Sequence, residues 1–181
     1  MKPSGFAHTI EISEEAGVRY LHFGSSWVQG AMRLRRPDAL ELEYTREMLT
    51  CLLWRDWALW PRNILLIGLG PGSLAKFLLR HLPRARLRIV EIDSRIPAFA
   101  QRHFGFPVDA PRVSMEIADG SVYVREISER FDLILVDGFD QCARATTLDT
   151  PEFYRDCLAR LASEGVMATN LFGNVRGFDR S

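Results

Sequence analysis

The sequence has little of what marks extracellular, metal-binding or membrane-spanning proteins. Its three cysteines, Cys51, Cys142 and Cys157, are too few and too scattered for a disulfide framework. Its four histidines share no metal-ligand spacing, so we expect no metal site. No apolar run approaches the roughly 20 residues needed to cross a bilayer, and residues 1–6 lack the apolar segment of a signal peptide. These absences predict a reduced, cytoplasmic protein that does not bind membranes.

An excess of charge of either sign is also lacking. Lysine plus arginine and aspartate plus glutamate each number 23, so the net charge is zero. This balance argues against nucleic acid as a partner, because nucleic-acid binders are usually strongly basic. The 181 residues are 47% hydrophobic, with no internal repeat and no glycine- or serine-rich linker. Such a chain is long enough to bury a core without disulfides.

The pattern of the chain changes near residue 61. The first part contains short strand-like segments, and we expect three of them: Thr9–Ser13, Val18–Phe23 and Trp27–Leu34. A helix should follow, with Asp38 as its N-cap and Glu41 as the capping-box partner, and should run to about Leu59. We assign residues 1–37 to a small N-terminal β-strand region.

The second part alternates strands and helices. Strands are expected at Asn63–Gly68, Leu87–Ile92, Val113–Ile117, Phe131–Val136 and Val166–Leu171. Helices are expected at Leu74–Leu82, Ile96–Phe104, Ser121–Ile127 and Pro151–Leu161. Alternation of this kind builds βαβ units with right-handed crossovers. The fold class is therefore α/β, with a Rossmann-like parallel sheet over residues 38–181.

A glycine-rich turn lies between the first of these strands and the helix that follows it. Gly68, Gly70 and Gly72 form a G-x-G-x-G pattern, and Glu91 ends the next strand. A carboxylate at that place can accept both hydroxyls of a ribose. The pattern differs from the dinucleotide motif G-x-G-x-x-G, and the turn has no basic residue for a phosphate. It is more typical of S-adenosylmethionine binding in the class I methyltransferase fold.

Carboxylates also follow the third and fourth strands of this sheet. Asp119, before Gly120, is placed to accept a hydrogen bond from an adenine amino group or to cap the helix at Ser121, and both roles are compatible. Asp137 comes directly after a buried strand, at the sheet edge where ligands of open α/β sheets bind. Asp140 follows three residues later, and the two carboxylates together would suit a cationic amine; alone, Asp140 is equally compatible with a solvated loop.

These motifs, in this order, resemble those of the spermidine synthase (polyamine aminopropyltransferase) family. The resemblance runs from about Thr9 to Phe172 and includes Gln29, at the place of a glutamine that lines that family's active site. Four core motifs carry it: Gly68–Gly72, Val90–Asp93, Asp119–Gly120 and Asp137–Asp140.

The resemblance implies transfer of an aminopropyl group from decarboxylated S-adenosylmethionine to an amine such as putrescine, without a metal. Glu91 would bind the ribose, Asp119 the adenine, and Asp137, with Asp140 nearby, would orient the amine and accept its proton. The remaining co-substrate contacts that it implies are Gln29, Gly68, Gly70, Gly72, Ile92 and Gly120. Because the family often forms dimers, we also expect a homodimer.

The sequence departs from the family pattern at several places. Pro71 stands where the family's glycine turn usually has an aspartate, and Thr45-Arg46-Glu47 stands where its first helix has Tyr-His-Glu. One hypothesis is that Arg46 pairs with the carboxylate of intact S-adenosylmethionine. The alternatives are therefore an S-adenosylmethionine-dependent methyltransferase or a catalytically degenerate nucleoside-binding homologue.

Five strands are expected where such a sheet usually has seven, which indicates a shortened member or a fragment.

Overall fold

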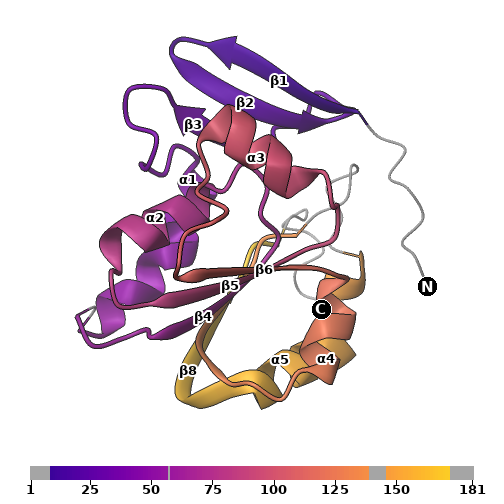
Figure 1. The fold of residues 1–181 in the computed structure, drawn as a ribbon. Coiled ribbons are helices and arrows are strands. Elements are labelled where there is room, and N and C mark those ends of the chain that lie inside the picture. The colour runs from indigo at the N-terminus through magenta and orange to yellow at the C-terminus, as the bar shows by residue number, and fades with distance from the viewer. Residues whose placement is uncertain (1–8, 57, 139–145, 172–181) are drawn as a thin grey trace, which may run out of the picture.

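A computed structural model describes residues 9–56, 58–138 and 146–171. It contains a three-stranded antiparallel sheet and a five-stranded parallel sheet flanked by helices (Figure 1). The small sheet consists of β1 (Ile10–Glu15), β2 (Val18–Phe23) and β3 (Gly30–Arg33). The large sheet consists of β4 (Asn63–Ile67), β5 (Arg86–Glu91), β6 (Val113–Ile117), β7 (Phe131–Val136) and β8 (Leu161–Thr169). The helices are α1 (Glu43–Met48), the 3₁₀ helix η1 (Leu49–Trp54), α2 (Ser73–His81), α3 (Ile96–Phe104), α4 (Gly120–Glu126), the 3₁₀ helix η2 (Thr146–Leu148) and α5 (Pro151–Arg160).

The large sheet confirms the predicted Rossmann-like class. Its strand order is β6-β5-β4-β7-β8, and every neighbouring pair is parallel. The order reverses at β4, where β5 lies on one side and β7 on the other. Ligands of open α/β sheets bind at the carboxyl ends of the strands at this point. The predicted bounds of α3, β6 and β7 agree with the structure residue for residue.

Alternate residues of β4 face two different helical layers. Ile64 and Leu66 pack in one core with residues of α2, α3 and η1, whereas Leu65 and Ile67 pack in a second core with residues of α4 and α5. This arrangement explains why the strand is a continuous apolar run, since both of its faces are buried. The sheet is thereby held rigidly between helices, and its carboxyl edge offers a fixed base for a site.

The small sheet packs against α3 through a cluster of Leu21, Met32 and Phe104. The turn between β1 and β2 has Ala16 and Gly17 both at positive φ, a geometry that matches the twist of a tight hairpin. The third strand is shorter than the predicted Trp27–Leu34, because Trp27 is exposed and only Gly30–Arg33 pairs with β2. The boundary between residues 37 and 38 stays a prediction.

The helix predicted from Asp38 to Leu59 is wrong at both ends. The α-helix begins at Glu43, is not capped by a side chain, and changes to the 3₁₀ helix η1 at Leu49. Glu41 does not complete a capping box, because its carboxylate instead pairs with Arg33, with Arg33 Nε 2.9 Å from Glu41 Oε2. The ion pair links the end of β3 to the segment before α1.

The last strand also differs from its prediction of Val166–Leu171. It begins directly after α5, at Leu161, and its register with β7 is irregular between Phe131 and Leu133. The residues between Leu161 and Val166 suggest a loop by composition, yet the irregularity accommodates them within the strand. No helix among the described residues has the length and apolar character needed to cross a membrane.

Candidate active site

The glycine turn after β4 touches the end of β7. Gly68 has a φ of +92°, and a side-chain Cβ there would overlap the carbonyl group of Asp137. The amide of Asp137 donates to the carbonyl oxygen of Ile67 at 2.8 Å. Only glycine meets both the positive φ and the close approach, so the turn holds Asp137 at the carboxyl edge of the sheet.

The same turn contacts the N-terminal sheet. Gly70 and Gly72 also have positive φ, and the carbonyl oxygen of Gln29 lies 3.8 Å from the place of a Cβ on Gly70. A Cβ on Gly30 would overlap the ring of Pro71, so these two residues pack in direct contact. The N-terminal segment therefore forms one wall beside the glycine turn, and the role of Gln29 in binding the co-substrate stays a prediction.

Glu91 is a buried carboxylate that organises the loops above β4 and β5. Its side chain, 7% exposed, accepts hydrogen bonds from the backbone amides of Leu69 and Asp93, each at 2.9 Å. Burial raises the pKa of this carboxyl, and the backbone amides partly offset the rise by stabilising its charge. Ile92 is exposed directly beside it. The carboxylate thus ties the glycine turn to the end of β5.

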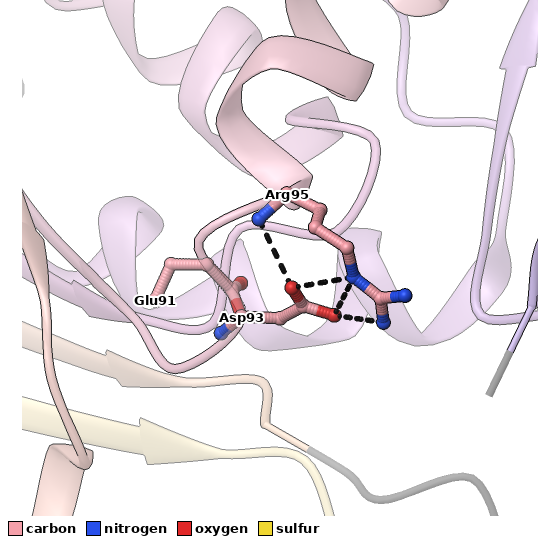
Figure 2. Close-up of polar contacts among 3 residues, drawn as sticks. All are labelled: Glu91, Asp93 and Arg95. Carbon is pink, nitrogen blue, oxygen red and sulfur yellow. Dashed lines mark hydrogen bonds and ion pairs between the residues drawn. The ribbon is translucent and has the colours of Figure 1, made fainter. Parts of the chain in front are cut away.

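A second carboxylate two residues later is neutralised locally. The buried Asp93 binds Arg95 through both the backbone amide and the guanidinium, with Nη2 2.6 Å from Oδ2 (Figure 2). The pKa of the Arg95 guanidinium is raised, chiefly by this hydrogen bond. The charge of Asp93 is therefore satisfied within its own loop, which begins α3.

Asp119 caps α4. Its Oδ1 accepts hydrogen bonds from the amide of Ser121 at 2.8 Å and from the Ser121 hydroxyl at 2.7 Å. The structure therefore shows the helix-capping role that the sequence predicted for Asp119. The Oδ2 atom of this carboxylate makes no hydrogen bond to another described residue. Gly120 is tightly packed, because a Cβ there would lie 2.5 Å from Cγ2 of Ile67.

Asp137 is held by side chains from two other elements. Its Oδ2 accepts a hydrogen bond from the Tyr44 hydroxyl at 3.2 Å, and its Oδ1 accepts one from the Asn170 amide at 2.9 Å. Burial raises the pKa of the Asp137 carboxyl, while the bonds from Asn170 and Tyr44 act in the opposite direction. Burial and the neighbouring Asp137 also raise the pKa of the Tyr44 hydroxyl, which keeps it a donor. The second predicted amine-site carboxylate, Asp140, lies outside the described residues.

A small cavity of about 10 Å³ lies beside this carboxylate. It is bounded by the end of β7, the glycine turn, α1 and the N-terminal sheet, and its lining includes Tyr44, Thr45, Pro71 and Asp137. Asp137 is the only charged group among the described residues that line it. The lining of this cavity therefore favours one polar group that can donate a hydrogen bond to the carboxylate.

Comparisons with known proteins identify the family to which the chain belongs. The family model described as "Spermine/spermidine synthase domain" matches residues 44–172. The chain belongs to the spermine/spermidine synthase family. Among curated relatives, the polyamine aminopropyltransferase of Chromobacterium violaceum is 41% identical over 161 residues, which cover 89% of this chain and 60% of that protein. The chain thus spans about three fifths of that relative's length.

Solved structures show the same fold. A probable spermidine synthase from Corynebacterium glutamicum matches with a TM-score of 0.77 at 23% identity, over 92% of this chain and 61% of that chain. A spermidine synthase in complex with the transition-state analogue AdoDATO matches with a TM-score of 0.64 at 23% identity, over 88% of this chain and 56% of that chain. The family resemblance and the fold class predicted from the sequence are confirmed.

The sequence analysis missed two residues of this candidate site, Tyr44 and Asn170. The resemblance puts Thr45 at the place of the family's tyrosine, whereas the tyrosine that reaches Asp137 in the structure is Tyr44, one position earlier. Asn170 directly follows β8, and its backbone amide donates to the carbonyl oxygen of Val136 at the end of β7. A polar residue at the end of an apolar strand can indicate a site residue. However, the order of the strands was needed to place Asn170 beside Asp137.

The hypothesis that Arg46 meets the cofactor is not supported. Its Nη1 atom donates to the carbonyl oxygens of Leu40 and Glu41 at 3.0 and 3.1 Å. Thr45 is buried beside the Asp137 cavity, whereas Arg46 is exposed and lines a different cavity. Adjacent residues of a helix point about 100° apart, which explains why only one of them faces the site.

Proposed function

We propose that this chain transfers an aminopropyl group from decarboxylated S-adenosylmethionine to an amine such as putrescine, with Asp137 as the base. The observation that carries the proposal is the partly buried Asp137 carboxylate, bound by Tyr44 and Asn170 at the edge of the sheet. Family membership, the name of the curated relative and the AdoDATO complex of a similar fold all support it.

The chemistry requires a base at this place. An alkyl ammonium has a pKa near 10, as lysine does, so the amine must lose a proton before its nitrogen can attack. Asp137 would orient the amine and take that proton, and the freed nitrogen lone pair would then bond to the aminopropyl carbon. The bond from that carbon to the sulfonium sulfur breaks, and its electron pair stays on sulfur, which leaves as a neutral thioether of the nucleoside. Asp140 would support the amine beside Asp137.

The nucleoside half would use the ends of β5 and β6. Each carboxylate offers about four lone pairs, so Glu91 can accept ribose hydroxyls in addition to its two backbone amides. Asp119 can accept from the adenine amino group through Oδ2 while Oδ1 caps α4. The exposed Ile92 offers an apolar contact for the nucleoside, and the remaining contacts that the family resemblance implies are Gln29, Gly68, Gly70, Gly72 and Gly120.

The proposal is tested by following both products. The 181-residue chain is incubated with decarboxylated S-adenosylmethionine and putrescine, and spermidine and methylthioadenosine are measured by mass spectrometry. We expect both products in equal amounts and neither without putrescine. Conversion of S-adenosylmethionine to S-adenosylhomocysteine instead would indicate a methyltransferase. Binding of the decarboxylated compound without turnover would overturn the proposal in favour of a nucleoside-binding homologue.

The proposal also includes the oligomeric state and the cellular location of the protein. We propose a homodimer in the cytoplasm that acts on small molecules and binds neither membranes nor nucleic acid. The equal numbers of acidic and basic residues and the family membership support this.

We expect Tyr44→Phe to move the acid limb of the pH profile of kcat/KM to higher pH. The Tyr44 hydroxyl stabilises the charged form of Asp137, so its removal raises the pKa of that carboxyl further, and the base becomes protonated at a higher pH. Tyr154→Phe is the matched control, because it removes a hydroxyl bonded to the remote Asp149. An acid limb that stays in place or moves to lower pH contradicts a positioning role for Tyr44.

A further inference from the structure

An open groove of about 640 Å³ lies away from Asp137, between the segment before α1, the helices α1 and η1, and the second half of α2. Its surface is mostly apolar, and the residues responsible are Leu40, Leu49, Leu52, Leu53 and Phe77. Leu53 is 84% exposed, which is unusual for a large aliphatic side chain. A groove of this size is within the range of sites that bind small molecules.

Positive charge surrounds this apolar surface. Arg36, Arg46 and Arg80 line the groove, and Asp38 is its only acidic residue among those described. None of the three arginines forms an ion pair with another described residue. Arg46 is fixed by the carbonyl oxygens of Leu40 and Glu41, which bind only its Nη1 atom and leave the rest of the guanidinium available. The groove therefore combines an apolar floor with unpaired cations.

The groove is separate from the proposed active site. It shares no lining residue with the cavity beside Asp137, although both are bounded by α1 and α2. Ser73 and Leu74 at the start of α2 face the Asp137 cavity, whereas Arg80 and His81 at its end line the groove. A substrate of the aminopropyl reaction is cationic at its amines, and three unpaired arginines would repel it.

We propose that this groove binds an amphipathic anion: a carboxylate or phosphate head joined to an aliphatic or aromatic body. The guanidinium groups would bind the head, because their planar donors match the oxygens of carboxylate and phosphate. The apolar side chains would cover the body and gain free energy from its burial. This inference does not depend on the proposed transferase activity.

Calorimetry with a matched set of eight-carbon probes tests the proposal. Octanoate and octyl phosphate should bind, and octanol and octylammonium should bind at least about tenfold more weakly. Butanoate, which has four methylene groups fewer, should also bind at least about tenfold more weakly than octanoate. Higher salt should weaken octanoate binding, because the arginines are exposed to solvent.

Variants assign the binding to the groove. The double variant Arg36→Gln and Arg80→Gln should weaken octanoate binding about tenfold. The control, Arg102→Gln and Arg125→Gln, removes two exposed arginines of α3 and α4 outside the groove and should leave binding unchanged. Equal binding of octanol and octanoate, equal loss in both double variants, or no binding of either anion overturns the proposal. So does tighter binding of a glutamate-rich peptide than of octanoate, which would identify an acidic protein segment as the partner.

Discussion

Replacing Asp137 by asparagine is expected to lower kcat/KM for aminopropyl transfer by roughly 10²- to 10⁴-fold, the usual contribution of a positioned general base. The amide has nearly the shape of the carboxylate and can still bond to Tyr44 and Asn170, so the cavity should keep its form. It cannot take the proton of the amine. The loss should therefore be in the chemical step, and binding of the nucleoside should persist.

The same strand supplies a matched control for this substitution. Asp132 lies near the other end of β7, where its Oδ2 accepts from the backbone amides of Arg62 and Asn63 at 2.8 and 2.9 Å. Asp132→Asn should retain activity, since this carboxylate is remote from the carboxyl edge of the sheet. Steady-state kinetics and thermal unfolding of both variants complete the test. Near-parental turnover by Asp137→Asn would show that another group accepts the proton.

Stability between pH 8 and pH 10.5 should depend on Lys76. This lysine of α2 is 4% exposed, and its Nζ atom lies 2.7 Å from the carbonyl oxygen of Phe104 and 3.0 Å from the sulfur of Met32. Burial lowers its pKa from 10.5 to about 8, and the nearby charge of Asp38 offsets only part of this change. Among the described residues, no carboxylate forms a hydrogen bond with this buried ammonium.

The direction of the pH effect follows from proton binding. Between pH 8 and pH 10.5 the unfolded lysine is largely protonated and the folded one largely neutral, so the unfolded state binds more protons and stability rises with pH. The rise from this group is about 3 kcal/mol, because each unit of pKa corresponds to about 1.4 kcal/mol. Below the folded pKa the full penalty is present and no longer changes with pH.

We expect Lys76→Met to remove this rise. The free energy of unfolding, measured by urea denaturation from pH 7 to pH 10.5, should increase with pH more steeply for the parent chain than for the variant. Subtraction of the two curves cancels the tyrosines and cysteines that titrate in the same range. Arg80→Met removes an exposed cation from the same helix and should follow the parent curve. Parallel curves for parent and Lys76→Met would contradict a buried lysine with a lowered pKa.

Local sequence patterns were sufficient for most of the large sheet. Apolar runs such as Leu133–Val136 specify buried strands, because few other arrangements hide both faces. The helix expected from Asp38 failed because its capping signal was satisfied elsewhere: Glu41 bonds to Arg33 of β3. A local motif cannot reveal that a distant partner competes for one of its residues. Tertiary contacts therefore decided where α1 begins.

The residues of the candidate site likewise include some that local sequence could predict and others that depend on tertiary contacts. Glu91 and Asp137 could be predicted because each follows a buried strand whose carboxyl end must lie at one edge of the sheet. The hydroxyl of Tyr44 and the amide of Asn170 could not, because their approach to Asp137 depends on how α1 and β8 pack beside β7. The side-chain bonds of Glu91 to Leu69 and Asp93 likewise need the geometry of two loops.

The partners of Asp137 lie 93 residues before it and 33 residues after it in the chain. The pKa of the proposed base thus depends on two residues that lie far from its own strand in the sequence. A substitution at position 44 or 170 can shift the pH range of the reaction while the sheet, the glycine turn and the carboxylate stay as they are. The working range of such an enzyme can therefore diverge between relatives whose core motifs are identical.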